Sequence, residues 1–290
     1  MSQNRFVEKS YTSQDGLSLY YRDYPALQNS GVPVLCLAGL TRNSQDFHDL
    51  ASRLSEHRRV ICPDYRGRGK SQYDKDWRNY IPRTYVDDIR HLMVVSGLHR
   101  MVVIGTSMGG ILASALAVAT PSALAGAVLN DVGPDINPQG IAKIIAYISN
   151  DTSLENLDAV IRHLQSTFPN LPASDEQGWL KIAEATFRQC DDGLYRFNWD
   201  PDLALPFQRN TFQTPDLWPM FRALSRTPAA AIRGQLSDVL SEETFSRMEN
   251  EISGLECCTV NGVGHAPSLS EPECQDLIES VLAKADKKGH

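Results

Sequence analysis

Apolar residues follow two different spacings along the chain. Phe47, Leu50, Ala51 and Leu54 recur at the spacing of a helix over about 45–56. Short continuous apolar runs predict buried β-strands instead, and they occupy 60–62, 102–104, 126–130, 229–234 and 256–260. Strands that alternate with helices in this way predict an α/β fold with a mostly parallel central sheet flanked by helices. The functional site of such a sheet is expected at the carboxyl ends of its strands.

Three further elements follow from local signals. Residues 5–23 predict an antiparallel hairpin, because Asp15-Gly16 is a strong two-residue turn signal between them. Residues 84–96 have helical spacing and predict a second helix. The sequence Ser-Glu-Pro-Glu that begins at Ser270 is a capping box, so a final helix is expected after it.

The alternation of strands and helices stops between residues 135 and 228. Helical periodicity returns there in three segments, 141–148, 154–168 and 179–190, with no strand-length apolar run between them. We therefore predict a helical unit, residues 135–228, inserted into one α/β domain. That domain is expected to comprise residues 1–134 and 229–290.

Residues 101–110, Met-Val-Val-Ile-Gly-Thr-Ser-Met-Gly-Gly, are the most informative segment. A β-rich run ends in Gly105-Thr106-Ser107-Met108-Gly109, and a helical stretch of small residues follows. This context indicates a nucleophile elbow, a turn so sharp that only glycines fit two residues on either side of the serine. The turn exposes the Ser107 hydroxyl and directs the Met108 N–H toward a developing oxyanion. The plainer interpretation is a glycine-rich turn with a capping serine.

A serine nucleophile needs a histidine base, and His265 has the expected position. It lies in Asn-Gly-Val-Gly-His-Ala-Pro, directly after the strand predicted at 256–260. The other histidines fall within helical patterns, beside arginines near helix ends, or in the C-terminal tail. His265 is therefore the candidate by position and by elimination.

Two aspartates compete for the role of the acid that orients His265. Asp238 stands in the loop after the strand predicted at 229–234, a usual place for this carboxylate. Asp131 ends the strand predicted at 126–130, and some triads take their acid from that earlier strand. Either residue also has a structural interpretation, as a helix cap or a turn residue. We favour Asp238, because its loop is the usual location, and keep Asp131 as the alternative.

These features together resemble the α/β-hydrolase superfamily over nearly the whole chain. Residues 33–43 are similar to the strand and loop that supply the second oxyanion N–H, although this chain has Ala38-Gly39 where the family usually has His-Gly. The resemblance implies that the backbone of Leu40 is this donor. Residues 64–71, Asp-Tyr-Arg-Gly-Arg-Gly-Lys-Ser, are similar to the family's D-x-R-G-x-G-x-S loop, which we interpret as structural. In the family the acid commonly lies three residues after the glycine, whereas Asp238 lies four after Gly234.

The resemblance also implies that the inserted helical unit is a cap that closes over the nucleophile and shapes the substrate pocket. Arg42 is a candidate ligand for a substrate carboxylate, although a solvated loop charge explains it slightly better. Trp199 and Trp218 are the expected substrate-binding residues of the cap. The other candidates for its lining are Ile144, Ile145, Tyr147, Phe187 and Phe207, most of which ordinary packing would also explain.

The expected reaction is the hydrolysis of carboxylic esters through an acyl-enzyme on Ser107, as in a carboxylesterase. The first alternative is hydrolysis of a C–C bond in diketo acids, as in the meta-cleavage-product hydrolases of the same superfamily, and lactone hydrolysis is another. Some members of this fold keep the triad and act chiefly as ligand receptors, so a binding role is the alternative of a different class.

Composition limits the partners and the compartment. The chain has 290 residues, 42% of them hydrophobic and 22% charged, which is enough for one sizeable core and a smaller inserted unit. A net charge of −7 argues against nucleic acid. We expect six reduced cysteines, no metal, no cofactor and a small-molecule ester as partner, with a homodimer left open.

The first eight residues lack an apolar signal core, which predicts a cytoplasmic protein. The apolar stretch 111–129 is interrupted by Pro121 and is expected to be a buried helix and strand rather than a membrane span.

Overall fold

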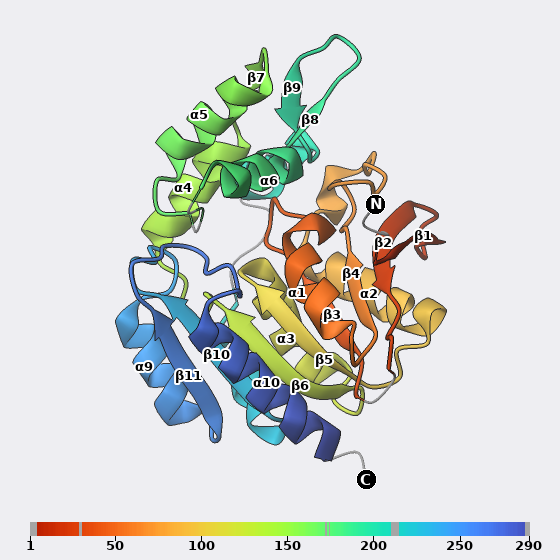
Figure 1. Cartoon of the computed structure of the whole chain (residues 1–290), viewed down its shortest axis with the longest axis vertical. Coiled ribbons are helices and arrows are strands. Elements are labelled where there is room, and N and C mark those ends of the chain that lie inside the picture. Colours follow the sequence, from red (N-terminus) through yellow and green to blue (C-terminus); the bar gives the residue numbers. More distant parts are fainter. Residues whose placement is uncertain (1–4, 29–30, 172, 174, 210–214, 288–290) are drawn as a thin grey trace.

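An eight-stranded sheet forms the centre of the computed structural model, which describes residues 5–28, 31–171, 173, 175–209 and 215–287 (Figure 1). The strand order is β1-β2-β4-β3-β5-β6-β10-β11. β1 pairs antiparallel with β2, and β2 with β4, while the other neighbours pair in parallel. The predicted hairpin and the mostly parallel sheet are therefore confirmed. The strands are β1 (Val7–Thr12), β2 (Ser18–Tyr24), β3 (Val34–Leu37), β4 (Val60–Pro63), β5 (Met101–Thr106), β6 (Leu124–Asn130), β10 (Ala229–Gly234) and β11 (Leu255–Val260).

Helices cover both faces of this sheet. In Figure 1, α1 and α10 lie in front of the strands, and α2 and α3 pack against each other behind them. α9 packs against β11. The buried residues of these helices and the almost wholly buried strands β3 to β6 form one apolar core. The elements are η1 (Ser44–Phe47), α1 (His48–Leu54), η2 (Trp77–Asn79), α2 (Pro82–Ser96), α3 (Met108–Ala119), α9 (Glu242–Glu251) and α10 (Pro272–Lys287).

The long apolar stretch 111–129 divides between the twelve-residue helix α3 and the strand β6, which confirms the predicted buried helix and strand. Both elements belong to the core. Within the described ranges, no helix combines the length and the apolarity that a bilayer span requires.

The parallel register brings several loops to one edge of the sheet. Thr106 at the end of β5 is paired with Asn130 at the end of β6, and Asn130 is paired with Ile232 near the end of β10. On the other side of β5, Gly105 is paired with Leu37, the last residue of β3. The loops that follow β3, β5, β6, β10 and β11 therefore meet, as expected for the carboxyl ends of parallel strands.

Residues between β6 and β10 form the inserted unit, whose extent of 135–228 stays a prediction. Figure 1 shows α4 to α6 and β7 to β9 together above the sheet. The three predicted helical segments correspond to α4, α5 and α6, but the unit also contains a small antiparallel sheet in the order β7-β9-β8, which the sequence analysis missed. Two later elements, α8 and η4, pack against α3 of the core. The elements are α4 (Pro138–Ile148), β7 (Ser153–Leu154), α5 (Leu157–Thr167), α6 (Glu176–Thr186), β8 (Phe187–Gln189), β9 (Tyr195–Phe197), η3 (Pro201–Ala204), α7 (Leu205–Gln208), α8 (Trp218–Arg222) and η4 (Ala223–Arg226).

Candidate active site

Ser107 occupies the sharp turn between β5 and α3. Its backbone has φ +53° and ψ −120°, a conformation that L-residues rarely adopt and that is held here by a hydrogen bond from its N–H to the Asn130 carbonyl (2.9 Å). Both flanking positions need glycine, because the backbone there approaches other backbone atoms too closely for a Cβ. A Cβ on Gly105 would stand 2.3 Å from the carbonyl carbon of Gly109, and a Cβ on Gly109 would stand 2.0 Å from the carbonyl oxygen of Leu37. The predicted elbow therefore has the geometry that the G-x-S-x-G sequence requires.

His265 lies in the loop after β11 and pairs with a buried carboxylate. Its Nδ1 is 2.6 Å from Oδ2 of Asp131, whose side chain is completely buried, while the His265 side chain is 18% exposed. Asp131 follows β6 directly and has φ +56°. Its carboxylate also accepts hydrogen bonds from the Gly234 N–H (2.8 Å) and the Ser237 hydroxyl (2.6 Å). A carboxylate held by three donors fixes the His265 ring and the tautomer with the proton on Nδ1, which leaves Nε2 free to accept a proton.

Asp238, which we expected to orient His265, does not contact it in the structure. Its carboxylate is exposed and pairs with Lys143 of α4 (2.6 Å). The position three residues after Gly234, where the family commonly has its acid, is occupied by Ser237. Because the Ser237 hydroxyl donates to Asp131, the loop after β10 supports the acid rather than supplying it. Our preference for Asp238 was therefore wrong in geometry, and Asp131 is the residue paired with His265.

The two expected oxyanion donors, Leu40 and Met108, have backbone N–H groups available. Within the described part of the chain, neither N–H donates to a protein acceptor. Met108 is the first residue of α3, where helical N–H groups have no intrahelical partner and the helix dipole favours negative charge. Leu40 follows β3, which pairs with β5 up to Gly105. The Met108 N–H therefore lies directly after Ser107 at the start of α3, and the Leu40 N–H lies on the loop after the neighbouring strand β3.

The loop that carries Leu40 is fixed through its carbonyl groups. The Tyr65 hydroxyl donates to the Ala38 carbonyl (3.1 Å), and the Arg42 N–H donates to the Gly39 carbonyl (3.2 Å). Nε of Arg68, a completely buried side chain, donates to the Leu40 carbonyl (2.8 Å). With three successive carbonyls engaged in this way, the peptide groups of the loop have a fixed orientation, as an oxyanion hole requires.

Arg68 is held in turn by aromatic and polar contacts on the core side. Its Nη1 donates to the Arg66 carbonyl and to the Tyr85 hydroxyl, both at 2.9 Å, and its guanidinium lies 4.7 Å from the centre of the Tyr85 ring. No ion pair of Arg68 with a carboxylate occurs among the described residues. Residues 64–71 were predicted to be only a structural loop. Their sequence does not reveal the contact of Arg68 with Leu40, because the contact joins loops 28 residues apart.

A cavity of about 810 Å³ contains Ser107 and His265. Its core side includes the loop 39–42 and the loop after β11, and the side formed by the inserted unit (the cap side) is mostly apolar. The apolar residues of the cap side are Ile144, Tyr147, Leu164, Phe168, Leu171, Ile182 and Ala185. Polar and charged side chains also line the cavity, most of them on the core side, such as Arg22, His48 and Arg53. A concave site that combines apolar walls with polar groups is typical of small-molecule binding.

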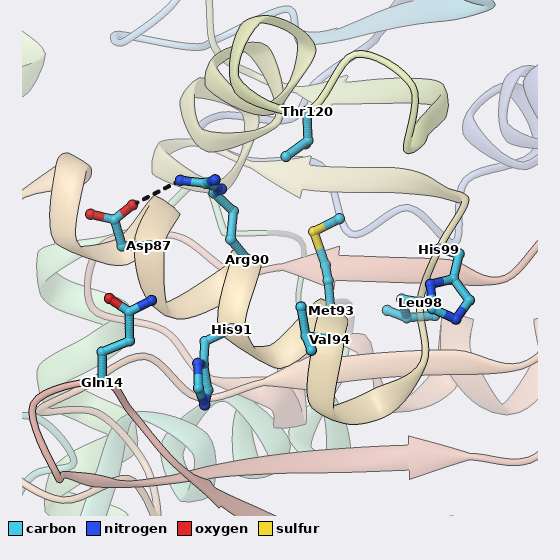
Figure 2. A pocket seen from close by; sticks show the side chains of 9 residues that line it. All are labelled: Gln14, Asp87, Arg90, His91, Met93, Val94, Leu98, His99 and Thr120. Carbon is cyan, nitrogen blue, oxygen red and sulfur yellow. Dashed lines mark hydrogen bonds and ion pairs between the residues drawn. The ribbon is translucent and has the colours of Figure 1, made fainter.

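A second cavity, of about 430 Å³, lies beside α2 (Figure 2). Figure 2 shows the Asp87–Arg90 ion pair (3.4 Å) at one side and Met93, Val94 and Leu98 along the other. Neither Ser107 nor His265 lines this cavity. The candidate active site is therefore the larger one.

Arg42 lines the larger cavity, but its guanidinium is bound by the protein. Nε and Nη2 donate to the two carboxylate oxygens of Asp46 (2.7 and 2.5 Å), and Nη1 donates to the Thr186 hydroxyl at the end of α6. Burial acts to lower the pKa of Arg42, and Asp46 more than offsets this, so the net shift is upward and the side chain stays charged. Arg42 thus joins the loop after β3 to the cap.

The two tryptophans that we expected to bind substrate do not line the cavity. Trp199 is almost completely buried and stacks on Phe197, with ring centres 4.1 Å apart. Trp218 begins α8, and its Nε1–H donates to both carboxylate oxygens of Asp135 (3.0 Å each). Both large side chains stabilise packing, the usual fate of aromatic residues at helical spacing. Of the other lining candidates, Ile144 and Tyr147 line the cavity, whereas Phe187 does not.

Comparisons with known proteins identify the family of this chain. Residues 32–272 match the family described as alpha/beta hydrolase fold. The chain is 32% identical to 3-hydroxybutyrate-oligomer hydrolase of Cupriavidus necator over 247 residues, 82% of this chain and 84% of that protein. It is 27% identical to 2-(acetamidomethylene)succinate hydrolase of Mesorhizobium japonicum, over 85% of this chain and 86% of that protein. A crystal structure of an alpha/beta hydrolase from Novosphingobium aromaticivorans is similar with a TM-score of 0.91 and 39% identity, over 98% of this chain and all of that one. The chain therefore belongs to the α/β-hydrolase fold family.

Proposed function

We propose that the protein hydrolyses carboxylic esters with Ser107 as nucleophile, His265 as general base and Asp131 as the carboxylate that orients His265. Nε2 of His265 takes the proton of the Ser107 hydroxyl, and the oxygen attacks the ester carbonyl carbon. The N–H groups of Leu40 and Met108 stabilise the oxyanion, and His265 returns the proton to the departing alcohol. A water molecule activated by His265 then releases the acid from Ser107.

One observation carries this proposal. Nδ1 of His265 is 2.6 Å from a completely buried carboxylate, and this histidine shares a cavity with a serine held in a strained turn. A histidine oriented in this way has its free nitrogen available as a base, and a serine in such a turn has an exposed hydroxyl.

With Arg42 engaged, the residue that we considered for the carboxylate of a diketo acid is not free, which favours neutral esters, although Arg22, Arg53 and Lys181 also line the cavity. A C–C hydrolase acting on a diketo acid needs a cation for the substrate carboxylate, and Arg42 was the residue that we considered for this role. Its donors point to Asp46 and Thr186 instead. The similarity to an enzyme named for 3-hydroxybutyrate oligomers also favours esters, because oligomers of a hydroxy acid are joined by ester bonds. C–C hydrolysis and lactone hydrolysis are the alternatives against which the proposal is tested.

Steady-state hydrolysis of p-nitrophenyl esters, from acetate to decanoate, tests the proposal. The wild type should complete many turnovers per active site, and Ser107→Ala should lower the rate to background while unfolding at an unchanged temperature. The preferred acyl length then measures the depth of the cavity. Stoichiometric binding without turnover would indicate a receptor. Absence of ester hydrolysis together with cleavage of a diketo acid would show the C–C alternative to be correct.

A further inference from the structure

Tyr147 differs from the other cap residues that line the catalytic cavity. It lies on α4, and its hydroxyl is buried and has no hydrogen-bond partner among the described residues. The other polar side chains on this side of the cavity are Lys181, Glu184 and Thr186, and Glu184 is an exposed carboxylate that cannot donate to a substrate oxygen. Lys181 pairs with Asp49 (2.8 Å), and the Thr186 hydroxyl both donates to the Ile182 carbonyl and accepts from Arg42.

Four rings fix the position of the Tyr147 side chain. The Tyr147 ring meets those of Phe168 and Phe197 edge-on, with centres 4.7 and 5.0 Å away, and it stacks on His163 at 6.3 Å. Trp199 lies 5.7 Å away and is itself stacked on Phe197. The tryptophan that the sequence suggested as a substrate ligand therefore supports another residue of the cavity. A ring held on several sides cannot swing its hydroxyl into solvent.

The chemistry of this hydroxyl makes it a donor. Burial raises the pKa of Tyr147, and the nearby charge of Arg42 opposes only part of that shift, so the phenol keeps its proton at neutral pH. A buried hydroxyl without a partner is costly, and a complex in which it donates to an acceptor regains a hydrogen bond. The neighbouring cavity wall is apolar, with Ile144, Leu164 and Phe168. An acceptor that reaches Tyr147 must therefore come from a mostly apolar molecule with one oxygen at that point.

We infer that Tyr147 is a specificity-determining residue that selects esters with a second oxygen acceptor, a carbonyl or ester group, in the acyl chain beyond the scissile bond. The inference rests on the proposed ester hydrolysis and names its substrate class. Esters of oxo acids and oligoesters belong to this class, and simple alkanoate esters of the same length do not. The binding energy of the second oxygen appears in kcat/KM, because the acyl chain stays in the cavity through the transition state.

Matched substrates test this inference. We would measure kcat/KM for two pairs of p-nitrophenyl esters, pentanoate with 4-oxopentanoate and hexanoate with 5-oxohexanoate, after correction for the spontaneous hydrolysis of each. The wild type should prefer the oxo ester in at least one pair by about fivefold to tenfold, the range for one neutral hydrogen bond. Tyr147→Phe should abolish this preference by lowering kcat/KM for the oxo ester only. Its melting temperature should equal or exceed that of the wild type, because the lost hydroxyl has no protein partner.

Tyr73→Phe is the matched control. The Tyr73 hydroxyl is also buried and has no partner among the described residues, but Tyr73 does not line the catalytic cavity. This variant should keep the wild-type preference in both pairs. Equal ratios in the wild type and Tyr147→Phe, or a clear fall in the melting temperature of Tyr147→Phe, would overturn the inference while leaving ester hydrolysis intact. If no ester of the set is hydrolysed, the proposed function fails, and the inference fails with it.

Discussion

Replacement of Asp131 by asparagine separates the two candidates for the acid. The asparagine oxygen can still accept the Gly234 N–H, but its NH₂ group then faces the Ser237 hydroxyl and Nδ1 of His265, which both donate to the carboxylate in the wild type. The serine hydroxyl can rotate to accept. The histidine can accept only as the other tautomer, which carries its proton on Nε2 and cannot take the proton of Ser107.

The expected loss in kcat for Asp131→Asn is about 10⁴-fold, the effect of the wrong tautomer in a Ser-His-Asp triad. That factor corresponds to about 5 kcal/mol of activation free energy. The charge-assisted hydrogen bond between His265 and a completely buried carboxylate accounts for about 1.5–3 kcal/mol of it. The rest is the cost of restoring the productive tautomer.

Asp238→Asn is the matched control. The Asp238 side chain is 45% exposed and its partner Lys143 is 70% exposed, so kcat should stay within about twofold of the wild type. Both variants would be assayed with the best p-nitrophenyl ester, and thermal unfolding would show that each is folded. A large loss in Asp238→Asn with near-normal activity in folded Asp131→Asn would refute the assignment.

Two further substitutions test the scaffold of the site. Gly109→Ala should lower the free energy of unfolding by about 3 kcal/mol, because its Cβ would lie 2.0 Å from the Leu37 carbonyl oxygen. Gly178→Ala on α6 is the control and should change this free energy by less than about 1 kcal/mol, because the nearest atom to its Cβ would be 3.3 Å away. Urea unfolding measures both, and equal values would contradict the close approach at the elbow. Arg68→Met should lower kcat about tenfold and leave KM within about threefold, since it frees the Leu40 carbonyl and loosens the oxyanion loop. Steady-state kinetics at several ester concentrations separate the two constants, and a change in KM alone would show that Arg68 acts on binding instead.

The sheet and the elbow could be predicted because local sequence determines them. The continuous apolar run before Gly105 requires a buried strand, and the glycines at 105 and 109 are the only residues that fit the turn. The short strands of the cap were missed for the opposite reason. β8 and β9 have three residues each, too few to show a period, although Asp192-Gly193 between them was a readable turn signal.

The acid and the pocket lining depend on tertiary structure, which the sequence shows only indirectly. Asp131 and Asp238 both follow a strand, and only the parallel pairing of β6 with β10 decides which carboxylate faces His265. The spacing of Asp238, four residues after Gly234 instead of three, was the one signal against it. Likewise, Trp199 and Tyr147 both lie in the inserted unit, and only the packing of their rings decides which one reaches the cavity.

Acid quenching of the enzyme during turnover, followed by peptide mapping by mass spectrometry, detects a covalent acyl-enzyme and identifies its nucleophile. With p-nitrophenyl butyrate as substrate, we expect a butyryl group on the peptide that contains Ser107, and no such group in Ser107→Ala. His265→Ala should remain unacylated on the same timescale, because the serine has lost its base. An acyl group on another residue, or turnover retained by Ser107→Ala, would show that Ser107 is not the nucleophile.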